Sequence, residues 1–259
     1  MFFSCNIYLN SIDERKKTMT MIRPGKFDIT DKAMEIWDLP KGSKVLEIGC
    51  GEGDTAQHLT DKYGFDVTGM DISLAMIDKA KEAHPGIEFM YGDGEILDSF
   101  MSFTFDGIVY ECVLSLISMA DEALHEAYCV MKKGAKIFIS DLYMRDPPED
   151  LVKSVKIEAD RIAKIPHQEG DCEDEHNSGE LRFLDFRYEG RFFIEPLIEQ
   201  MKEIGFTNIK FEDRTDDLIQ YVGQKVFDEG KDALDTCMTC ASKDDKKTGY
   251  FMITAEKPL

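Results

Sequence analysis

The chain has 259 residues, of which 43% are hydrophobic, so it is long enough to bury a full core and has the composition of a globular protein. Its formal net charge of −20 at pH 7 disfavours nucleic acid and anionic membrane surfaces as partners, because a strongly acidic surface repels phosphate groups. No apolar run approaches the ~20 residues of a membrane span, and the first five residues are too few for the core of a signal peptide. We therefore expect a soluble, cytoplasmic protein with a small-molecule partner, and the sequence leaves its oligomeric state open.

Runs with strand character alternate with helical runs along the chain. Thr30 is expected to cap a helix over residues 31–37, and the Lys-Lys-Gly sequence at 132–134 is expected to end a helix over 119–131. Further helices are predicted over 54–63, 73–84, 149–165, 195–204 and 215–229, and strands over 45–48, 65–70, 87–91, 105–110, 135–140, 207–212 and 249–256. This alternation favours an α/β sheet of mainly parallel strands.

A glycine turn follows the first predicted strand, in the sequence Val-Leu-Glu-Ile-Gly-Cys-Gly-Glu-Gly at residues 45–53. Glycine lacks the Cβ atom that would hold a ligand away from the backbone, so Gly49, Gly51 and Gly53 allow a close approach before the next helix. The spacing is not the G-x-G-x-x-G of a dinucleotide site, and this turn lacks the Lys-Ser/Thr ending of a phosphate-binding loop. The turn therefore predicts a ligand without a triphosphate.

Two carboxylates flank this turn. Glu47 lies inside the first strand, where a carboxylate near the strand end can face an ammonium group. Asp71 ends the second strand, 18 positions after Gly53, where a doubly wound sheet places an acid that binds ribose hydroxyls. A ligand with a ribose, a cationic end and no phosphate fits the description of S-adenosylmethionine.

Four segments together resemble the successive cofactor motifs of the class I S-adenosylmethionine-dependent methyltransferases, namely residues 45–53, 69–73, 92–95 and 105–109. The likeness is greatest to the branch that includes the ubiquinone/menaquinone C-methyltransferases, and it covers residues 40–142 well and 191–257 loosely. The resemblance implies a Rossmann-like, doubly wound, mostly parallel sheet of seven strands, with an antiparallel edge strand and a helical or loop cap inserted after strand five.

The same resemblance divides the chain into four parts. Residues 1–40 form an N-terminal arm and helix that cover the cofactor, and residues 41–143 form the cofactor-binding α/β core. Residues 144–192 form the substrate cap, and residues 193–259 form the C-terminal part of the same α/β domain. Within the cap, the segment 181–193 is rich in aromatic residues and arginine, which suits either substrate binding or ordinary core packing.

Cofactor-binding residues are also implied by the resemblance. The Asp93 carboxylate takes the adenine amino group, and Glu111 and Cys112 lie beside the methionine moiety and the transferable methyl group. In the arm, Tyr8 and Arg23 are candidates for a further contact, with ordinary surface anchoring as the alternative. The full predicted set combines acids, turn glycines and their neighbours: Glu47, Gly49, Cys50, Gly51, Gly53, Asp71, Ile72, Met76, Asp93, Gly94, Glu95, Glu111 and Cys112.

The expected reaction is in-line methyl transfer to a small molecule. It needs a nucleophile held near ~3 Å from the methyl group, in a pocket without competing water. A general base is required only when the acceptor must lose a proton. Glu111 is the predicted catalytic residue because of its motif position, with Asp141, His167 and His176 as alternatives. The histidines that relatives commonly carry at positions 115 and 116 are replaced here by serine and leucine.

The cysteines leave two other functions open. Their number is seven, without a regular framework, which indicates reduced thiols in a cytosolic protein. Cys237 and Cys240 form a C-x-x-C pair which, with Cys172, could bind a metal or metalloid. Arsenite methyltransferases use cysteines in this way, although the spacing of these three does not clearly match that family. The alternatives are therefore a thiol or metalloid methyltransferase and a catalytically silent, cofactor-binding regulatory protein.

Overall fold

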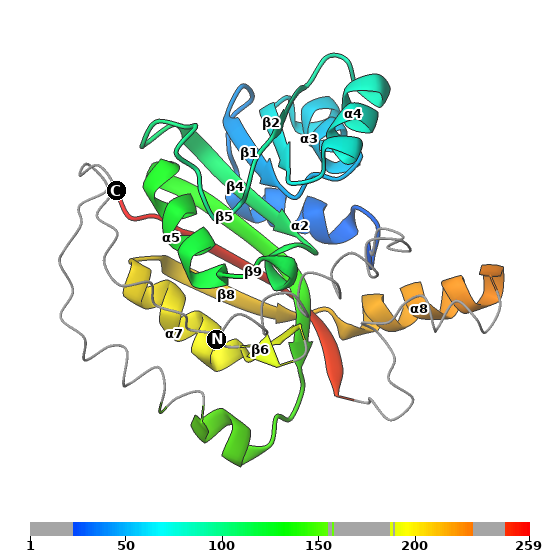
Figure 1. Ribbon diagram of the computed structural model, residues 1–259, viewed down its shortest axis with the longest axis vertical. Coiled ribbons are helices and arrows are strands. Elements are labelled where there is room, and N and C mark those ends of the chain that lie inside the picture. The colour runs from blue at the N-terminus through cyan, green and yellow to red at the C-terminus, as the bar shows by residue number, and fades with distance from the viewer. Residues whose placement is uncertain (1–22, 155–156, 158–186, 189, 230–246) are drawn as a thin grey trace, which may run out of the picture.

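The computed structural model describes residues 23–154, 157, 187–188, 190–229 and 247–259 (Figure 1). The helices are α2 (Asp28–Trp37), α3 (Asp54–Tyr63), α4 (Leu74–Ala83), α5 (Ala120–Val130), α7 (Ile194–Ile204) and α8 (Thr215–Glu229), with a 3-10 helix η1 (Leu114–Leu116) after the fourth strand. The strands are β1 (Lys44–Ile48), β2 (Asp66–Asp71), β3 (Glu88–Tyr91), β4 (Phe105–Glu111), β5 (Met131–Met144), β6 (Arg187–Tyr188), β7 (Arg191–Phe192), β8 (Thr207–Asp213) and β9 (Thr248–Glu256). Within these residues, no helix is long and apolar enough to cross a membrane.

One sheet contains the nine strands that the described residues form. Strands β3, β2, β1, β4 and β5 are parallel and adjacent in that order, so the strand order reverses between β1 and β4. Strand β9 runs antiparallel to β5, and β8 runs antiparallel to β9. This topology confirms the predicted Rossmann-like, doubly wound, mostly parallel sheet. Folds of this kind bind their ligands beyond the carboxyl ends of the strands at the point of reversal.

The sheet differs from the prediction in two details. The two-residue strands β6 and β7 form a hairpin that joins β5 through the pair Tyr143 and Phe192, so the sheet has nine strands instead of seven. The antiparallel strand β9 is not the edge strand, because β8 pairs with its other side. Strands of two residues are too short to show an alternating pattern, which is why the sequence did not predict the hairpin.

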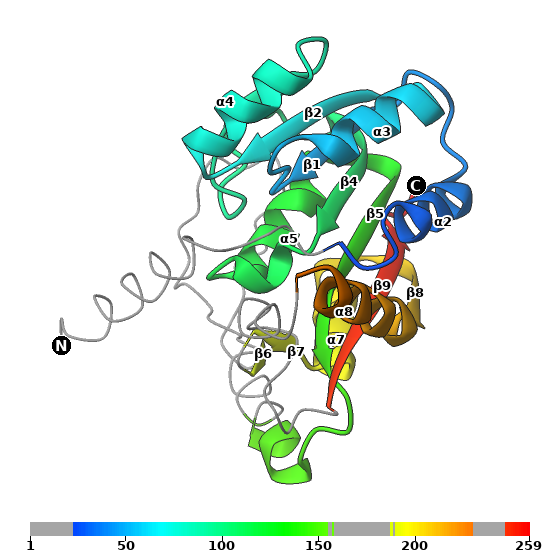
Figure 2. The ribbon, with the colours of Figure 1, turned by 90° about the vertical axis from the view of Figure 1, so that its right-hand side faces the viewer.

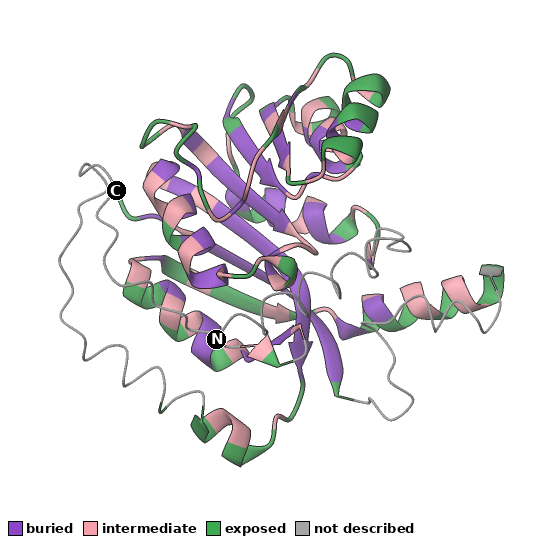
Figure 3. Ribbon diagram, viewed as in Figure 1, coloured by how far each residue is buried: buried purple, intermediate pink, exposed green. Residues whose placement is uncertain are grey.

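Helices cover both faces of the sheet, as Figure 2 shows from the side. Helices α5 and α7 pack on the face that carries Ile48 and Tyr110. Helices α2, α3, α4 and α8 pack on the opposite face, which carries Val45 and Val109. The central strands are buried along their length (Figure 3), as expected for parallel strands covered on both sides.

Helix α2 packs closely on the sheet at a glycine of β4. A Cβ atom built on Gly107 would lie 2.5 Å from Cζ3 of Trp37, which is only 3% exposed. The absence of a side chain at Gly107 therefore lets the indole lie directly on the strand. This contact holds α2 against the strand whose carboxyl end carries Glu111.

The predicted start of this helix is wrong. Helix α2 begins at Asp28 with Phe27 as its N-cap, so Thr30 lies inside the helix and does not cap it. The Thr30 side chain is fully buried, and its hydroxyl group donates a hydrogen bond to Glu111 of β4. Threonine is a common N-cap, and the sequence alone does not distinguish a cap from a buried hydroxyl group with a distant partner.

The predicted end of α5 is also wrong. The helix ends at Val130 and β5 begins at the next residue, so residues 132–134 belong to the strand. Phe105 of β4 pairs with Met131 of β5, and Gly107 pairs with Lys136. The register therefore shifts, and the additional residues of β5 between Met131 and Lys136 form a bulge. Gly134 has a φ of +79°, a conformation that serves a bulge as well as a helix end. The Lys-Lys-Gly pattern is therefore ambiguous between the two.

Strands β8 and β9 complete the same sheet as β1 to β5, consistent with one α/β domain. The predicted substrate cap, residues 144–192, lies largely outside the described residues. Its described parts are the end of β5, a helical segment at 149–154 and the β6–β7 hairpin. The four predicted domain boundaries stay a prediction.

Candidate active site

The glycine turn folds around the end of β2. The backbone N–H groups of Gly49 and Cys50 both donate to the carbonyl oxygen of Met70, at 2.7 and 3.0 Å. The N–H of Gly51 donates to Oδ2 of Asp71 at 2.9 Å. The predicted ribose-binding acid is therefore held against the turn, and the structure brings these two elements of the predicted cofactor site together.

Positive φ angles explain the choice of glycine in this turn. Gly49, Gly51 and Gly53 have φ angles of +73°, +56° and +87°, which disfavour a residue with a Cβ atom. Space is also restricted, because a Cβ on Gly49 would lie 2.2 Å from Cγ2 of Val113. A Cβ on Gly53 would lie 2.5 Å from Cζ of Phe89. The turn is thus packed on its inner side by side chains that follow β4 and lie in β3.

Glu47 is a buried carboxylate beside this turn. It is 3% exposed, and none of the residues that the structure describes forms a hydrogen bond with its Oε2 atom. Burial raises the pKa of Glu47 to about 8, and the negative charge of Glu111 acts in the same direction. The charge of Arg23 and the backbone N–H of Ala56 oppose this rise. A buried carboxylate oxygen without a partner suits a cationic ligand. Glu47 therefore fits the ammonium end of S-adenosylmethionine.

Glu111 lies at the carboxyl end of β4 and is held by two hydroxyl groups. Thr30 of α2 donates to its Oε1 at 2.9 Å, and Thr55 of α3 donates to its Oε2 at 2.7 Å. Arg23 donates in turn to the Thr55 hydroxyl oxygen at 2.7 Å. The predicted catalytic carboxylate therefore joins α2, α3 and β4. The predicted arm residue Arg23 reaches this group through Thr55, and its contact with the cofactor stays a prediction.

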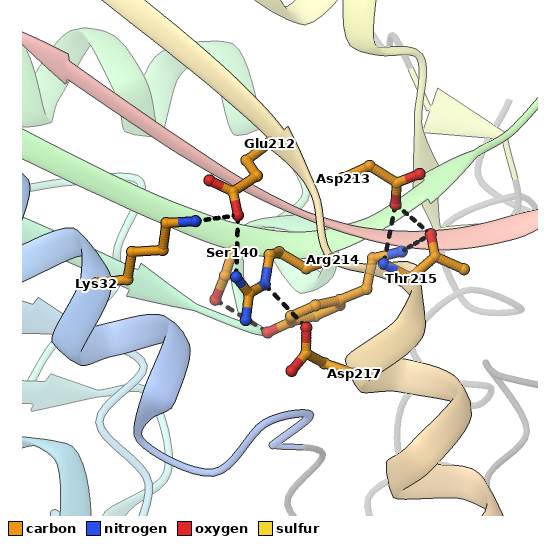
Figure 4. Close-up of polar contacts among 8 residues, drawn as sticks. Lys32, Ser140, Glu212, Asp213, Arg214, Thr215 and Asp217 are labelled. Atoms are coloured by element: carbon orange, nitrogen blue, oxygen red, sulfur yellow. Dashed lines mark hydrogen bonds and ion pairs between the residues drawn. The ribbon is translucent and has the colours of Figure 1, made fainter.

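A second set of polar contacts anchors α2 from its other side (Figure 4). Lys32 forms an ion pair with Glu212 of β8, and Arg214 donates to the same carboxylate at 2.9 Å. Arg214 also donates to Asp217 at the start of α8, at 2.9 Å. Helix α2 is thus tied to both β4 and β8, which fixes the position of Thr30 relative to the site.

The segment after β3 makes structural contacts and also contains predicted cofactor-binding residues. Oε1 of Glu95 accepts hydrogen bonds from the N–H groups of Ser118 and Met119, at 2.7 and 3.1 Å. It therefore satisfies two backbone N–H groups at the start of α5, which begins at the next residue. The carboxylate of Asp93 accepts from the N–H of Glu95 at 3.1 Å, and Gly94 packs against β1. Binding of adenine by Asp93 stays a prediction.

Apolar side chains border the carboxyl ends of β2 and β3. Ile72 and Tyr91 are 54% and 56% exposed, directly after β2 and at the end of β3. Met76 is half-buried in the first turn of α4, whose N-cap is Ser73, as predicted. Exposed apolar surface beside polar acceptors is the type of surroundings that an adenine ring requires.

Cys50 and Cys112 lie at the site but keep their protons. Burial raises the pKa of both thiols, and nearby carboxylates add to the effect. Cys112 has a φ of +56°, and its Sγ lies 2.8 Å from the hydroxyl oxygen of Tyr250. The Tyr250 hydroxyl oxygen also lies 3.0 Å from that of Ser140, so the thiol and two hydroxyl groups form one polar cluster. Both thiols thus make packing or hydrogen-bond contacts at the site, and their contact with the cofactor stays a prediction.

Asp141 is the remaining titratable candidate that the structure describes. It is 2% exposed, and burial raises its pKa to about 6. The N–H groups of Ser115 and Leu142 donate to its two oxygens, both at 2.8 Å, and together with the charge of Arg187 they oppose this rise. Asp141 is thus a fixed acceptor for the turn after β4. Four other candidates, Tyr8, His167, His176 and Cys172, lie outside the described residues, as do Cys237 and Cys240.

A comparison of the whole chain with known proteins completes the description of this site. A family model described as a methyltransferase domain matches residues 45–134, from the glycine turn into the start of β5. Phosphoethanolamine N-methyltransferase from Triticum aestivum is 25% identical over 222 residues, which cover 84% of this chain and 38% of that protein. Residues 45–134 therefore match a methyltransferase domain, and the comparisons together support a class I S-adenosylmethionine-dependent methyltransferase. S-adenosylmethionine is the cofactor of that class of enzymes, which agrees with the ligand predicted from the sequence.

Other methyltransferases share shorter stretches with this methyltransferase. Arsenite methyltransferase from Mus musculus is 30% identical over 130 residues, which cover 44% of this chain and 34% of that protein. The chain therefore spans well under half the length of the curated relatives described here.

Solved structures confirm the fold. Phosphoethanolamine N-methyltransferase 2 from Haemonchus contortus, in complex with S-adenosyl-L-methionine, has a TM-score of 0.65 and 18% identity, over 92% of this chain and 54% of that one. The [4+2]-cyclase SpnF has a TM-score of 0.63 and 21% identity, over 89% of this chain and 80% of that one. Because a cyclase has the same fold, the fold alone does not determine the reaction.

Three residues of this site were not predicted from the sequence. Thr30 and Thr55 hold Glu111 through contacts 81 and 56 positions apart in the chain, and no local pattern reports such a pair. Arg187 reaches the turn after β4 from the hairpin β6–β7. The only signal for it was the enrichment of arginine in the segment 181–193, which does not distinguish one arginine from another.

Proposed function

We propose that this methyltransferase transfers a methyl group from S-adenosylmethionine to a small-molecule acceptor by in-line displacement. The observation that carries the proposal is Glu47, a buried carboxylate with an unpartnered oxygen beside a glycine turn that Asp71 holds. It lies on β1, next to the point of strand-order reversal between β1 and β4. Such a group is costly to bury unless a cationic ligand compensates it.

Each acid has a proposed task. When bound, S-adenosylmethionine supplies an electrophilic methyl group on a sulfonium. Asp71 binds the ribose hydroxyls with the lone pairs that Gly51 and Ser73 leave free, since a carboxylate can accept about four hydrogen bonds. Glu47 faces the cationic end of the ligand, and Asp93 and Ile72 receive the adenine.

Glu111 is the proposed catalytic group. Its two oxygens each accept one hydroxyl hydrogen bond, which orients the carboxylate and leaves further lone pairs for an acceptor proton. If the acceptor carries a proton on its nucleophilic atom, Glu111 removes it during methyl transfer. Asp141 is a weaker candidate for this task because its side chain is only 2% exposed and holds the turn after β4 through the N–H group of Ser115.

Small-molecule acceptors are supported by the relatives and by charge. The relatives named above act, by their names, on phosphoethanolamine and arsenite. The net charge of −20 disfavours nucleic acid as a substrate. A cytoplasmic location and the absence of nucleic acid and membrane partners remain part of the proposal.

A turnover assay tests the proposal. The full chain is incubated with S-adenosylmethionine and with phosphoethanolamine, arsenite, a demethylmenaquinone analogue or a low-molecular-weight metabolite extract, and S-adenosylhomocysteine is quantified. We expect acceptor-dependent product, and a loss of about 10²-fold or more in kcat for Glu111→Gln if the acceptor loses a proton. Glu82→Gln, an exposed change on α4, is the matched control. Cofactor binding without product from any pool would favour the silent regulatory protein.

Methylation of a thiol or metalloid is the second candidate, favoured by the similarity to the mouse arsenite methyltransferase. It assigns Cys172, Cys237 and Cys240 to metalloid binding, and these residues lie outside the described part of the chain. Bound zinc or arsenic measured on purified protein, with Cys237→Ser alongside, separates the two candidates. Near-unit metal content that is lost in the variant supports the second.

A further inference from the structure

Arg187 of β6 binds the turn that follows β4. Its Nη1 donates to the carbonyl oxygens of Ser115 and Ile117 at 2.9 and 2.6 Å, with a longer contact of 3.4 Å to that of Leu114. Its Nη2 donates to the carbonyl oxygen of Ser118 at 3.0 Å. One guanidinium thus binds several carbonyl groups of a single turn, within and just after the short 3-10 helix, where backbone carbonyl groups lack helical partners at the helix end. The planar fork of arginine is suited to this task, and the single ammonium of lysine is not.

The opposite side of the same turn is held by Asp141. The N–H group of Ser115 donates to the Asp141 carboxylate at 2.8 Å, and the Ser115 hydroxyl group also contacts it. A buried anion therefore faces the N–H side of the turn, and a cation faces its carbonyl side. This order of charges matches the direction of the peptide dipoles in a helical turn. Residues 113–118, here called the clamped turn, are consequently fixed from two strands, β5 and β6.

The clamped turn packs directly on the proposed cofactor site. The side chain of Val113 fills the space beside Gly49, where a Cβ would lie 2.2 Å from Val113 Cγ2. Ile117 fills the space beside Gly94, at 3.1 Å from the position of a Cβ. The turn also continues the chain directly from Glu111 and Cys112. Its position therefore sets the inner wall of the glycine turn and the backbone next to the proposed catalytic carboxylate.

We propose that Arg187 is a positioning residue for methyl transfer: it docks the β6–β7 hairpin on the clamped turn and so completes the acceptor side of the site. The inference rests on the proposed function, which supplies the reaction. The hairpin is the last part of the segment inserted between β5 and α7. Docking of the β6–β7 hairpin and correct placement of Glu111 are therefore coupled through Arg187.

Hydrogen exchange of the full chain tests the clamp without any acceptor. In Arg187→Met we expect the backbone amides of the clamped turn to exchange at least about tenfold faster. The hydrogen bonds from the Arg187 guanidinium to the carbonyl groups of the turn are lost, so the turn opens more often. Arg187→Lys keeps the charge and is expected to show an intermediate rate. Lys153→Met removes one exposed positive charge from the inserted segment and is expected to match the parent. If circular dichroism shows that Arg187→Met does not fold, the exchange rates of Arg187→Lys test the inference instead.

Cofactor affinity and turnover separate positioning from general stability. We expect the Kd for S-adenosylhomocysteine to change by less than about threefold in Arg187→Met, whereas kcat falls by about tenfold or more. Unchanged exchange in the clamped turn would overturn the inference. An equal rise in exchange throughout β1 and β2 would also overturn it, because it would show a general structural role. Failure of the parent to bind S-adenosylhomocysteine contradicts the proposed function instead and leaves the exchange result standing.

Discussion

Thr30 of α2 donates a 2.9 Å hydrogen bond to Glu111 at the end of β4, although the two residues lie 81 positions apart. Through this bond, helix α2 helps to orient a carboxylate in the proposed cofactor site. Thr55 of α3 holds the other oxygen of Glu111 at 2.7 Å. The site is therefore assembled from separate elements, and each hydroxyl group has a measurable role.

Replacing Thr55 by valine should destabilise the protein. The change removes the donor to Glu111 and the acceptor for Arg23, and we expect a loss of about 1–3 kcal/mol in the free energy of unfolding. Thr60→Val is the matched control on the same helix, because the Thr60 hydroxyl group is buried and has no partner among the described residues. Urea unfolding measures both. A control that is as destabilised as Thr55→Val would contradict the role of the Glu111 contact.

The raised pKa of Glu47 predicts a pH-dependent stability. A carboxyl group whose pKa rises from 4.5 in the unfolded chain to about 8 in the folded one favours folding at low pH, where both states are protonated. This advantage is lost as pH rises from about 4.5 through about 8, by at most about 1.4 kcal/mol per pH unit. Relative to the parent, Glu47→Gln should therefore gain stability across this range. Parallel pH profiles of the two proteins would contradict the assignment.

The same group predicts proton release on cofactor binding. Below pH 8 the buried Glu47 is largely protonated, and the cationic ligand favours its ionised form. Calorimetric titration with S-adenosylmethionine in two buffers of different ionisation enthalpy should show net proton release at pH 7, and Glu47→Gln should abolish it. Equal binding enthalpies in both buffers for the parent would count against this role of Glu47.

Gly107 should not tolerate a side chain. A methyl group there would lie 2.5 Å from the Trp37 ring, so we expect Gly107→Ala to cost about 1–3 kcal/mol and to move α2. Gly86→Ala is the control, because a Cβ at Gly86 meets nothing within 4 Å. Thermal unfolding and tryptophan fluorescence report on both variants, since Trp37 is the single tryptophan of the chain. Similar melting temperatures for the two would refute the packing argument.

Local patterns predicted most of the fold. Apolar strands, glycine-terminated helices and the Ser73 cap are short-range features, and the structure reproduces α3, α4 and α8 almost residue for residue. The errors at Thr30 and at residues 132–134 arose where one residue type serves two local structures. The contacts with β4, made by Thr30 to Glu111 and by β5 along its length, decide which of the two local structures forms.

The site was predictable only in part, for a similar reason. Motif order predicted that Glu47, the glycine turn, Asp71 and Glu111 meet at the carboxyl ends of the parallel strands, and the structure places them there. The tasks of Glu95 and Arg187 depend on contacts between distant segments, which no spacing in the sequence reports. Glu95 was predicted to bind the cofactor, and the structure uses its Oε1 to hold the start of α5.

Binding of S-adenosylmethionine at the glycine turn is the central claim, and calorimetric titration of the parent and of Asp71→Asn tests it most directly. We predict saturable binding at one site in the parent, and a Kd that is at least about tenfold higher in the variant, because a neutral amide replaces a charged acceptor. No binding heat in the parent, or equal affinity in both proteins, would contradict the account.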